Sequence, residues 1–382
     1  MTTRIEVDRE LYEWAQSRSD LEPEELDERF PQLRAWLAGS AAPTVRQLEK
    51  FAAATRTPVG FFFLDSPPAE DIPVTDYRTL ADSGVARPSP DLLDTLYIAE
   101  RRQEWFRQYS MQAGLEPVQI VGSATTESPI EATARDIREA LEFQVDERPG
   151  TWAGALRDLR INAERLGVLV MVSGIVGTNT RRRLDPEEFR GFALVDSYAP
   201  VVFVNGSDTR AAQIFTLLHE LAHVWLGESA LDDAHPASRP SEAIERWCNR
   251  IAAETLVPGG ELRRAIRSDL PISDQLESLA GRFKSSTLVV LRRVFDADLL
   301  NWSEFRNLYE AELERVLGFV DQRSSDGGDF YKTQPVRTSA RFARALLSET
   351  LSGRTSFSTA MRLLGIRKAT TLSELAKTLG VT

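Results

Sequence analysis

The segment LLHELAHVWLG, residues 217–227, holds two of the three histidines of the chain, with a glutamate between them. In an α-helix, residues four apart lie on one face, so His219 and His223 can both bind one zinc ion. Zinc–imidazole bonds are about 2.0–2.1 Å long. Glu220 lies about 100° round the helix, where it can reach a water on the metal without being a ligand. This HExxH pattern joins two metal ligands to a general base, and it predicts zinc-dependent hydrolysis.

The context of the motif matters, because HExxH also occurs by chance. Its apolar neighbours predict a helix that is buried nearly all round, where two imidazoles without partners would be costly. The strand PVVFVNG, residues 200–206, precedes the helix by a short loop. As an edge strand, it could hold an extended peptide by adding it to the sheet. The alternative for the two histidines is a hydrogen-bonded pair in the core.

A second helix supplies a candidate third ligand. The segment SEAIERWCNRIAAETLVP, residues 241–258, carries Glu245 and Asn249 four apart on one face. Glu245 can complete a His-His-Glu set that leaves the fourth position open for water. Asn249 can orient one of the histidines through a hydrogen bond. Glu242 and Glu254 are the rivals of Glu245 for the third ligand.

Two further residues could stabilise the oxyanion of a tetrahedral intermediate. His235 lies in LDDAHPASRP, a polar loop between the two helices, and a solvent-exposed loop histidine is the alternative interpretation. Tyr331 lies in GGDFYKT, and no sequence pattern places it near the zinc. Cys248 lies inside the second helix, where we expect a small buried apolar side chain.

The composition limits the classes of function. A net charge of −11 and a pI of about 5.1 argue against a protein that mainly coats nucleic acid or an anionic membrane. One cysteine excludes an intrachain disulfide and suits a reducing cytosol. The N-terminus is charged, so no signal peptide is visible, and no apolar run has the roughly 20 residues of a membrane helix. We therefore expect a soluble cytoplasmic protein, of unspecified oligomeric state.

Periodicity predicts an α+β fold that is mostly helical, with a small β-sheet. Short helices fill the first 66 residues, and strands are expected at 168–174, 188–196 and 200–206, before the HExxH helix. The expected parts are an N-terminal helical domain (1–66), a linker and connector helix (67–127), a zincin-like peptidase domain (128–315) and a helical C-terminal tail (316–382). The arginines of the tail form either a solvated helix face or a surface for nucleic acid or a partner: Arg341, Arg344, Arg354, Arg362 and Arg367.

The paired motifs FTLLHELAHVWLG and IERWCNRIAAETLVP resemble those of the ImmA/IrrE family of zinc metallopeptidases. In that resemblance, Glu245 and Asn249 occupy the positions of the glutamate and asparagine in the second motif. The departures Cys248, Ile251 and Val257 are apolar and remove no chemical group. The resemblance covers about residues 130–300. It implies one zinc ion per chain and a protein substrate, a helix-turn-helix repressor or a toxin–antitoxin component, in bacterial or phage stress control.

The N-terminal region resembles a second family, the Xre/Cro-type helix-turn-helix. PQLRAWLAG occupies the place of the recognition helix and offers Gln32 and Arg34 to DNA. The preceding helix carries five acidic residues that would repel phosphates, so the favoured use is docking of a protein partner or packing against the catalytic body. A second helix-turn-helix-like segment, 272–300, offers Arg282 and Lys284, with core packing as the alternative.

These observations predict a zinc metalloendopeptidase of the gluzincin-like type. His219, His223 and Glu245 would bind the metal, Glu220 would activate water, and His235 or Tyr331 would stabilise the oxyanion. The alternative is a DNA-binding regulator or antitoxin whose peptidase fold binds a partner without proteolysis. The open fourth position argues against a purely structural zinc, because structural sites are usually closed.

Overall fold

The computed structural model describes residues 4–19, 21–68, 88–233, 242–320 and 330–381. Within these ranges the chain divides into two compact units, and the boundary falls after Leu96. The first unit therefore extends beyond the boundary expected near residue 66. It includes the start of helix α6 (Pro90–Gln112), where Asp91 pairs with Arg56 at 3.0 Å and Asp94 lies 3.9 Å from Arg18.

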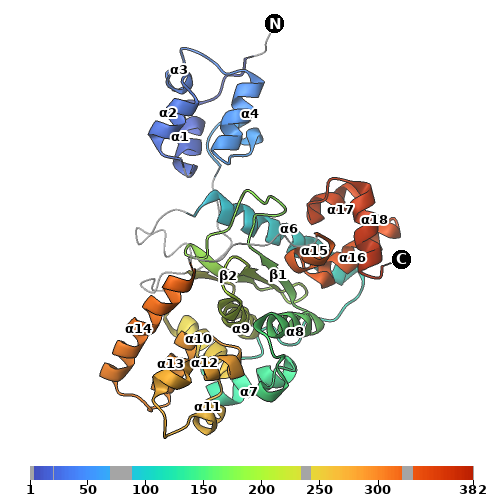
Figure 1. Cartoon of the computed structure of the whole chain (residues 1–382). Helices are drawn as coiled ribbons and strands as arrows, with labels where there is room; N and C mark the ends of the chain where they lie inside the picture. The colour runs from blue at the N-terminus through green and yellow to red at the C-terminus, as the bar shows by residue number, and fades with distance from the viewer. Residues whose placement is uncertain (1–3, 20, 69–87, 234–241, 321–329, 382) are drawn as a thin grey trace. The chain divides into compact units, whose positions relative to one another are not determined.

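The first unit is a bundle of short helices (Figure 1), and its core is rich in aromatic side chains. Tyr12, Trp36, Phe51 and Phe62 are nearly fully buried, with ring centroids 5.7–6.2 Å apart. Thr44 caps α4, since its side chain accepts a hydrogen bond from the Gln47 amide. The helices of this unit are α1 (Arg9–Arg18), α2 (Pro23–Arg29), α3 (Leu33–Leu37), α4 (Val45–Ala54) and the 3-10 helix η1 (Val59–Phe63).

The second unit contains a four-stranded sheet in the order β1-β3-β2-β4. Strand β3 pairs with β1 in parallel and with β2 in antiparallel register, and β2 pairs with β4 in antiparallel register. The three predicted strands are confirmed, but β4 was not predicted. The strands are β1 (Leu169–Ser173), β2 (Phe189–Leu194), β3 (Val201–Asn205) and β4 (Ala230–Asp233).

The interpretation of PVVFVNG as an edge strand is wrong. This segment forms β3, which has a neighbour on each side, so its backbone groups are already paired. Its fully buried apolar pattern fits a central strand, since both faces of such a strand are covered. The edges of the sheet are β1 and β4.

Helices cover both faces of the sheet (Figure 1). On one face, Val170, Val202 and Val204 belong to the same apolar core as α8 and α9. On the other face, Arg102 of α6 donates to the Met171 sulfur, and α15 and α16 pack against the edge strand β1. The predicted C-terminal tail is therefore helical, as expected, but it is part of the packed fold. The helices named here are α8 (Trp152–Arg165), α9 (Arg210–Leu226), α15 (Phe330–Thr338) and α16 (Ala340–Leu351).

The remaining helices complete this unit. Helices α7 and α10 pack against each other, and α10 also packs against α9. The predicted α+β, mainly helical fold is confirmed. No described helix combines the length and the apolar character that crossing a membrane requires. The remaining helices are α7 (Ile130–Ala140), η2 (Val145–Glu147), α10 (Glu242–Leu256), α11 (Gly259–Ala265), α12 (Ile272–Phe283), α13 (Thr287–Asp296), α14 (Trp302–Val320), α17 (Phe357–Leu364) and α18 (Ala369–Thr378).

Candidate metal centre

Helix α9 carries the HExxH motif through the core of the second unit. Its N-cap Thr209 accepts a hydrogen bond from the Ala212 amide, and Gly227 ends the helix in the left-handed conformation. The expected burial is confirmed, since His219, Glu220 and His223 are at most 1% exposed. The surrounding sheet and helices therefore limit the movement of these three side chains.

The structure brings the three predicted ligands together. The Nε2 atoms of His219 and His223 lie 3.1 Å apart. The carboxylate oxygens of Glu245, on α10, lie 3.2 Å from each of these nitrogens. In the part of the chain that the structure describes, this is the one cluster of three potential metal-binding side chains, all with ligand atoms within 4.8 Å. The packing of α10 against α9 produces this convergence.

The donor set fits a zinc ion. Two donors that each lie about 2.1 Å from a tetrahedral zinc are about 3.4 Å apart, close to the three observed separations. Burial acts to raise the pKa of the Glu245 carboxyl, but hydrogen bonds and charge from His219 and His223 outweigh it and hold the pKa well below its usual range. The carboxylate is therefore ionised, as a metal ligand must be. Three protein ligands of this kind are typical of catalytic zinc sites.

Glu220 is fully buried beside strand β2. A Cβ atom on Gly191 of β2 would lie 3.1 Å from the Glu220 Oε1 atom and 2.6 Å from the Thr216 Cγ2 atom. Only a residue without a side chain therefore lets α9 approach the strand this closely. Gly191 was missed in the sequence, although a glycine inside the strand FRGFAL is a signal of close approach.

The other candidate residues of α10 lie outside the cluster of metal ligands in the part of the chain that the structure describes. Asn249 is exposed, and no hydrogen bond links it to either histidine within the described ranges, so its predicted orienting role is not met. Glu254 instead pairs with Arg293 and accepts from the Gly259 amide, which removes it as a rival ligand. The side chain of Glu242 is outside the described residues. Cys248 is buried in the apolar core, as expected.

Of the two oxyanion candidates, the structure describes only Tyr331, and Tyr331 is not part of the cluster of metal ligands. His235 lies outside the described residues, so its role stays a prediction. Tyr331 lies in the first turn of α15, which packs against the edge strand β1. The sequence could not reveal this, because no local pattern records which strand a later helix packs against.

The candidate DNA contacts of the first unit are engaged within it. Arg34 pairs with Asp27 at 2.6 Å, and Gln32 accepts a hydrogen bond of 2.9 Å from Gln47. Helix α3 has only five residues, and its larger side chains Leu33 and Trp36 face the core. The side chains of Gln32 and Arg34 are exposed, so these contacts orient them without burying them, and DNA binding by this helix stays a prediction.

The candidate contacts of the second helix-turn-helix-like segment are also used by the fold. Lys284 is 9% exposed, ends α12 in a left-handed conformation and lies 5.4 Å from the ring centroid of Trp152. Arg282 pairs with Asp146 at 3.1 Å. The burial of Lys284 contradicts its prediction as a DNA contact and agrees with core packing, the alternative given above.

Two histidines and a glutamate on packed helices, beside a buried glutamate, define a metallopeptidase-like site. Residues 163–295 match the Peptidase_M78 family model, described as the IrrE N-terminal-like domain, which supports the resemblance to the ImmA/IrrE family. A domain of unknown function, DUF8813, matches residues 338–378. No curated protein matches the chain. Neither family match covers the first unit, so its Xre/Cro-type character stays a prediction.

Proposed function

We propose that the chain is a zinc-dependent metalloendopeptidase that cuts a protein partner. The observation that carries the proposal is the convergence of His219, His223 and Glu245 on one point, with Glu220 on the same helix. The three ligands would hold one zinc ion per chain. The similarity of residues 163–295, which include these four residues, to a metallopeptidase family also supports the proposal.

The residues of the site have distinct tasks in this proposal. When bound, zinc supplies Lewis-acid chemistry, which lowers the pKa of a water to about 7 and polarises a carbonyl oxygen. The Glu220 carboxylate accepts the proton of the attacking water and donates it to the leaving amine. The burial of Glu220 strengthens its interaction with nearby charge, because the local dielectric is low.

We further propose that the substrate is a helix-turn-helix repressor or a toxin–antitoxin component, and that the protein acts in the cytoplasm during bacterial or phage stress control. The similarity to the ImmA/IrrE family supports this choice of substrate. The single cysteine of this chain suits a reducing compartment such as the cytoplasm.

We also propose that the first unit binds a protein partner rather than DNA. Four glutamate side chains of the α2 segment are exposed, and they would repel a phosphate backbone: Glu22, Glu24, Glu25 and Glu28. The same charges would attract a basic protein surface.

Metal content tests the proposed site. We expect about one zinc per chain in the purified protein and a large loss in Glu245→Ala, because two imidazoles alone bind zinc weakly. The matched control is Glu228→Ala, which removes an exposed glutamate just after α9 and should keep its zinc. A folded wild-type protein that takes up no zinc from a zinc-containing buffer would exclude the metallopeptidase.

Cleavage is tested separately with Glu220→Gln, which keeps the three ligands and removes the base. Cells that express either protein are compared by sequencing of all new protein N-termini. We expect new cleavage sites in cells that express the wild type. The rate of cleavage at these sites should be about 10²–10⁴-fold lower with the variant. Equal biological activity of the two proteins, without new N-termini, would instead favour the regulator that binds without proteolysis.

A further inference from the structure

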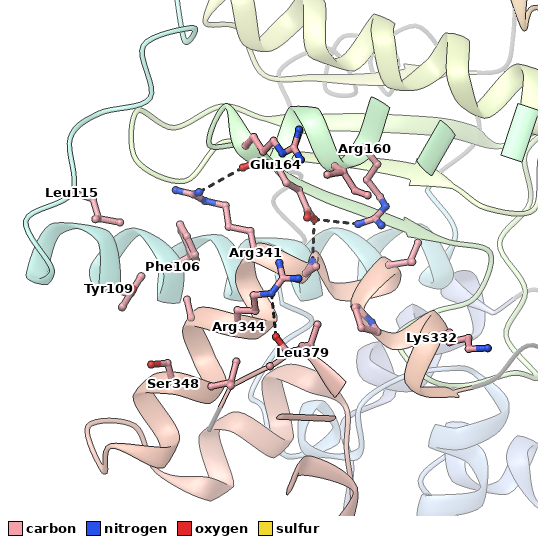
Figure 2. A pocket seen from close by; sticks show the side chains of 18 residues that line it. Phe106, Tyr109, Leu115, Arg160, Glu164, Lys332, Arg341, Arg344, Ser348 and Leu379 are labelled. Atoms are coloured by element: carbon pink, nitrogen blue, oxygen red, sulfur yellow. Dashed lines mark hydrogen bonds and ion pairs between the residues drawn. The ribbon is translucent and has the colours of Figure 1, made fainter. Parts of the chain in front are cut away.

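A large cavity lies away from the metal centre, between the peptidase-like segment and the C-terminal helices (Figure 2). Its volume is about 1090 Å³. Its walls come from α6, α8, α15, α16 and residues 379–381. Because α8, α15 and α16 all pack against β1, the cavity is associated with the edge of the sheet remote from β4. Its size suits a small molecule rather than a macromolecular surface.

The charged lining of the cavity is strongly cationic. Glu164 is its only acidic lining residue among those the structure describes, and its carboxylate already accepts from the Ser339 hydroxyl at 2.8 Å and the Ala340 amide at 3.0 Å. Five cationic side chains line the cavity: Arg160, Arg165, Lys332, Arg341 and Arg344. Arg160 lies 3.5 Å from the Glu164 carboxylate and Arg165 lies 3.4 Å from that of Glu142, so the excess of positive charge rests on the side chains of α15 and α16.

Two arginines of α16 have weak partners within the fold. Arg341 donates to the Glu164 carbonyl oxygen at 3.5 Å, and Arg344 donates to the Leu379 carbonyl oxygen at 3.4 Å (Figure 2). The Nε atom of Arg341 is buried without a hydrogen-bond partner in the described part of the chain. Neither arginine has a carboxylate within 4.0 Å among the described residues. Hydrogen bonds this long are weak, so both guanidinium groups can bind an anion.

An apolar wall adjoins the arginines. Phe106 is buried, and its ring lies 5.6 Å from the Arg341 guanidinium carbon. Tyr109, Leu115 and Ile161 continue this wall. The cavity therefore combines an anion-binding side with aromatic and aliphatic contacts for a flat organic group.

We propose that this cavity binds a phosphorylated small molecule of nucleotide size. The phosphates contact Arg341 and Arg344, and the apolar part of the ligand packs against Tyr109, Leu115 and Ile161, which are more exposed than Phe106. Arginine suits this task because its planar guanidinium binds phosphate oxygens through two parallel hydrogen bonds. The ligand would contact both α8 and α16. Helix α8 overlaps the start of the segment matched by one family model (163–295), and α16 lies within the segment matched by the other (338–378). Helix α8 also packs against the metal-binding helix α9.

Binding to the full chain is measured by isothermal titration calorimetry, so no peptidase activity is needed. The probes are ATP, AMP, adenosine and inorganic phosphate. We expect ATP to bind, and AMP to bind more tightly than either adenosine or phosphate, because the two halves of the cavity both contribute. Arg341→Gln and Arg344→Gln should each weaken ATP binding by about tenfold or more.

The matched control is Arg362→Gln on α17, which removes the same charge outside the cavity and should leave ATP binding unchanged. Arg344 is exposed, so its variant should fold even if Arg341→Gln does not. Absence of ATP binding, or equal loss in all three variants, overturns the proposal. Phosphate binding as tight as that of AMP overturns the nucleotide assignment. Tighter binding of a DNA oligonucleotide, lost in the same variants, would replace the ligand with a nucleic acid.

Discussion

Gly191 is the residue that lets the metal-binding helix lie directly against the sheet. It is buried in β2 opposite Val204, and a Cβ atom there would meet the Phe203 carbonyl oxygen at 2.8 Å. The same atom would meet Thr216 and Glu220 on α9. Backbone and buried side chains cannot yield easily, so an added methyl group must displace α9 or the strand.

Gly191→Ala should therefore destabilise the second unit by about 1–3 kcal/mol through overpacking, and it should disturb the position of Glu220. Urea unfolding and zinc content measure the two effects. The control is Gly281→Ala, inside α12, where no atom lies within 4 Å of an added Cβ. That variant should gain about 0.5–1 kcal/mol, because alanine has the higher helix propensity. Equal stability of the two variants would contradict this role of Gly191.

At the scale of elements, Arg148 joins the ends of two helices. It is 8% exposed, and it donates to the carbonyl oxygens of Thr255 and Leu256 at the end of α10 and of Phe283 at the end of α12. Burial, followed by the charge of Arg138, lowers its pKa to about 9, so the guanidinium is still charged at neutral pH. Its charge also suits two helix C-termini, where the carbonyl groups are partly negative. Arg148 thus fixes the end of the helix that carries Glu245.

Arg148→Met should lower the free energy of unfolding of the second unit by about 3 kcal/mol, because buried carbonyl groups lose their donors. Chemical denaturation measures the loss. Arg157→Met on α8 is the control, since Arg157 is exposed and pairs with the adjacent Asp158, and its change should stay within about 0.5 kcal/mol. A similar small change for Arg148→Met would show that water replaces its hydrogen bonds.

At the scale of the whole molecule, each of the two units has an apolar core of its own among the residues that the structure describes. One core belongs to the first unit and includes Leu48 and Phe51. The other surrounds α9 and the sheet, and all three metal ligands lie in that second unit. A ligand that binds only the folded form of one unit stabilises that unit directly.

We therefore expect two calorimetric unfolding transitions, of which zinc shifts only one. At free zinc 100-fold above its Kd, the second unit should gain about 2.7 kcal/mol. Leu48→Ala identifies the other transition, because a cavity in the first core costs about 2–5 kcal/mol. In Glu245→Ala, zinc should shift neither transition. A zinc-dependent shift of the transition lowered by Leu48→Ala would contradict two independent units.

The sequence predicted those parts of the site that depend on local periodicity. The spacing of His219 and His223 places both on one helical face, and the same reasoning selected Glu245 on the next helix. Asn249 shared that face in the sequence, yet it faces solvent, because periodicity gives an angle round the helix and not its distance from a neighbour. The proposal of Tyr331 as an oxyanion partner had no such support, since no local pattern records which strand a later helix packs against.

The sequence by itself thus determined the helices, three of the four strands and the chemical types of the metal-binding residues. These features follow from side-chain pattern along one element, which is a local property. The tertiary structure decided that β3 is central, that Lys284 is buried, that Gly191 lies against Glu220, and that arginines of α8 and α16 line one cavity. Each of these depends on contacts between residues distant in the chain, which packing alone brings together.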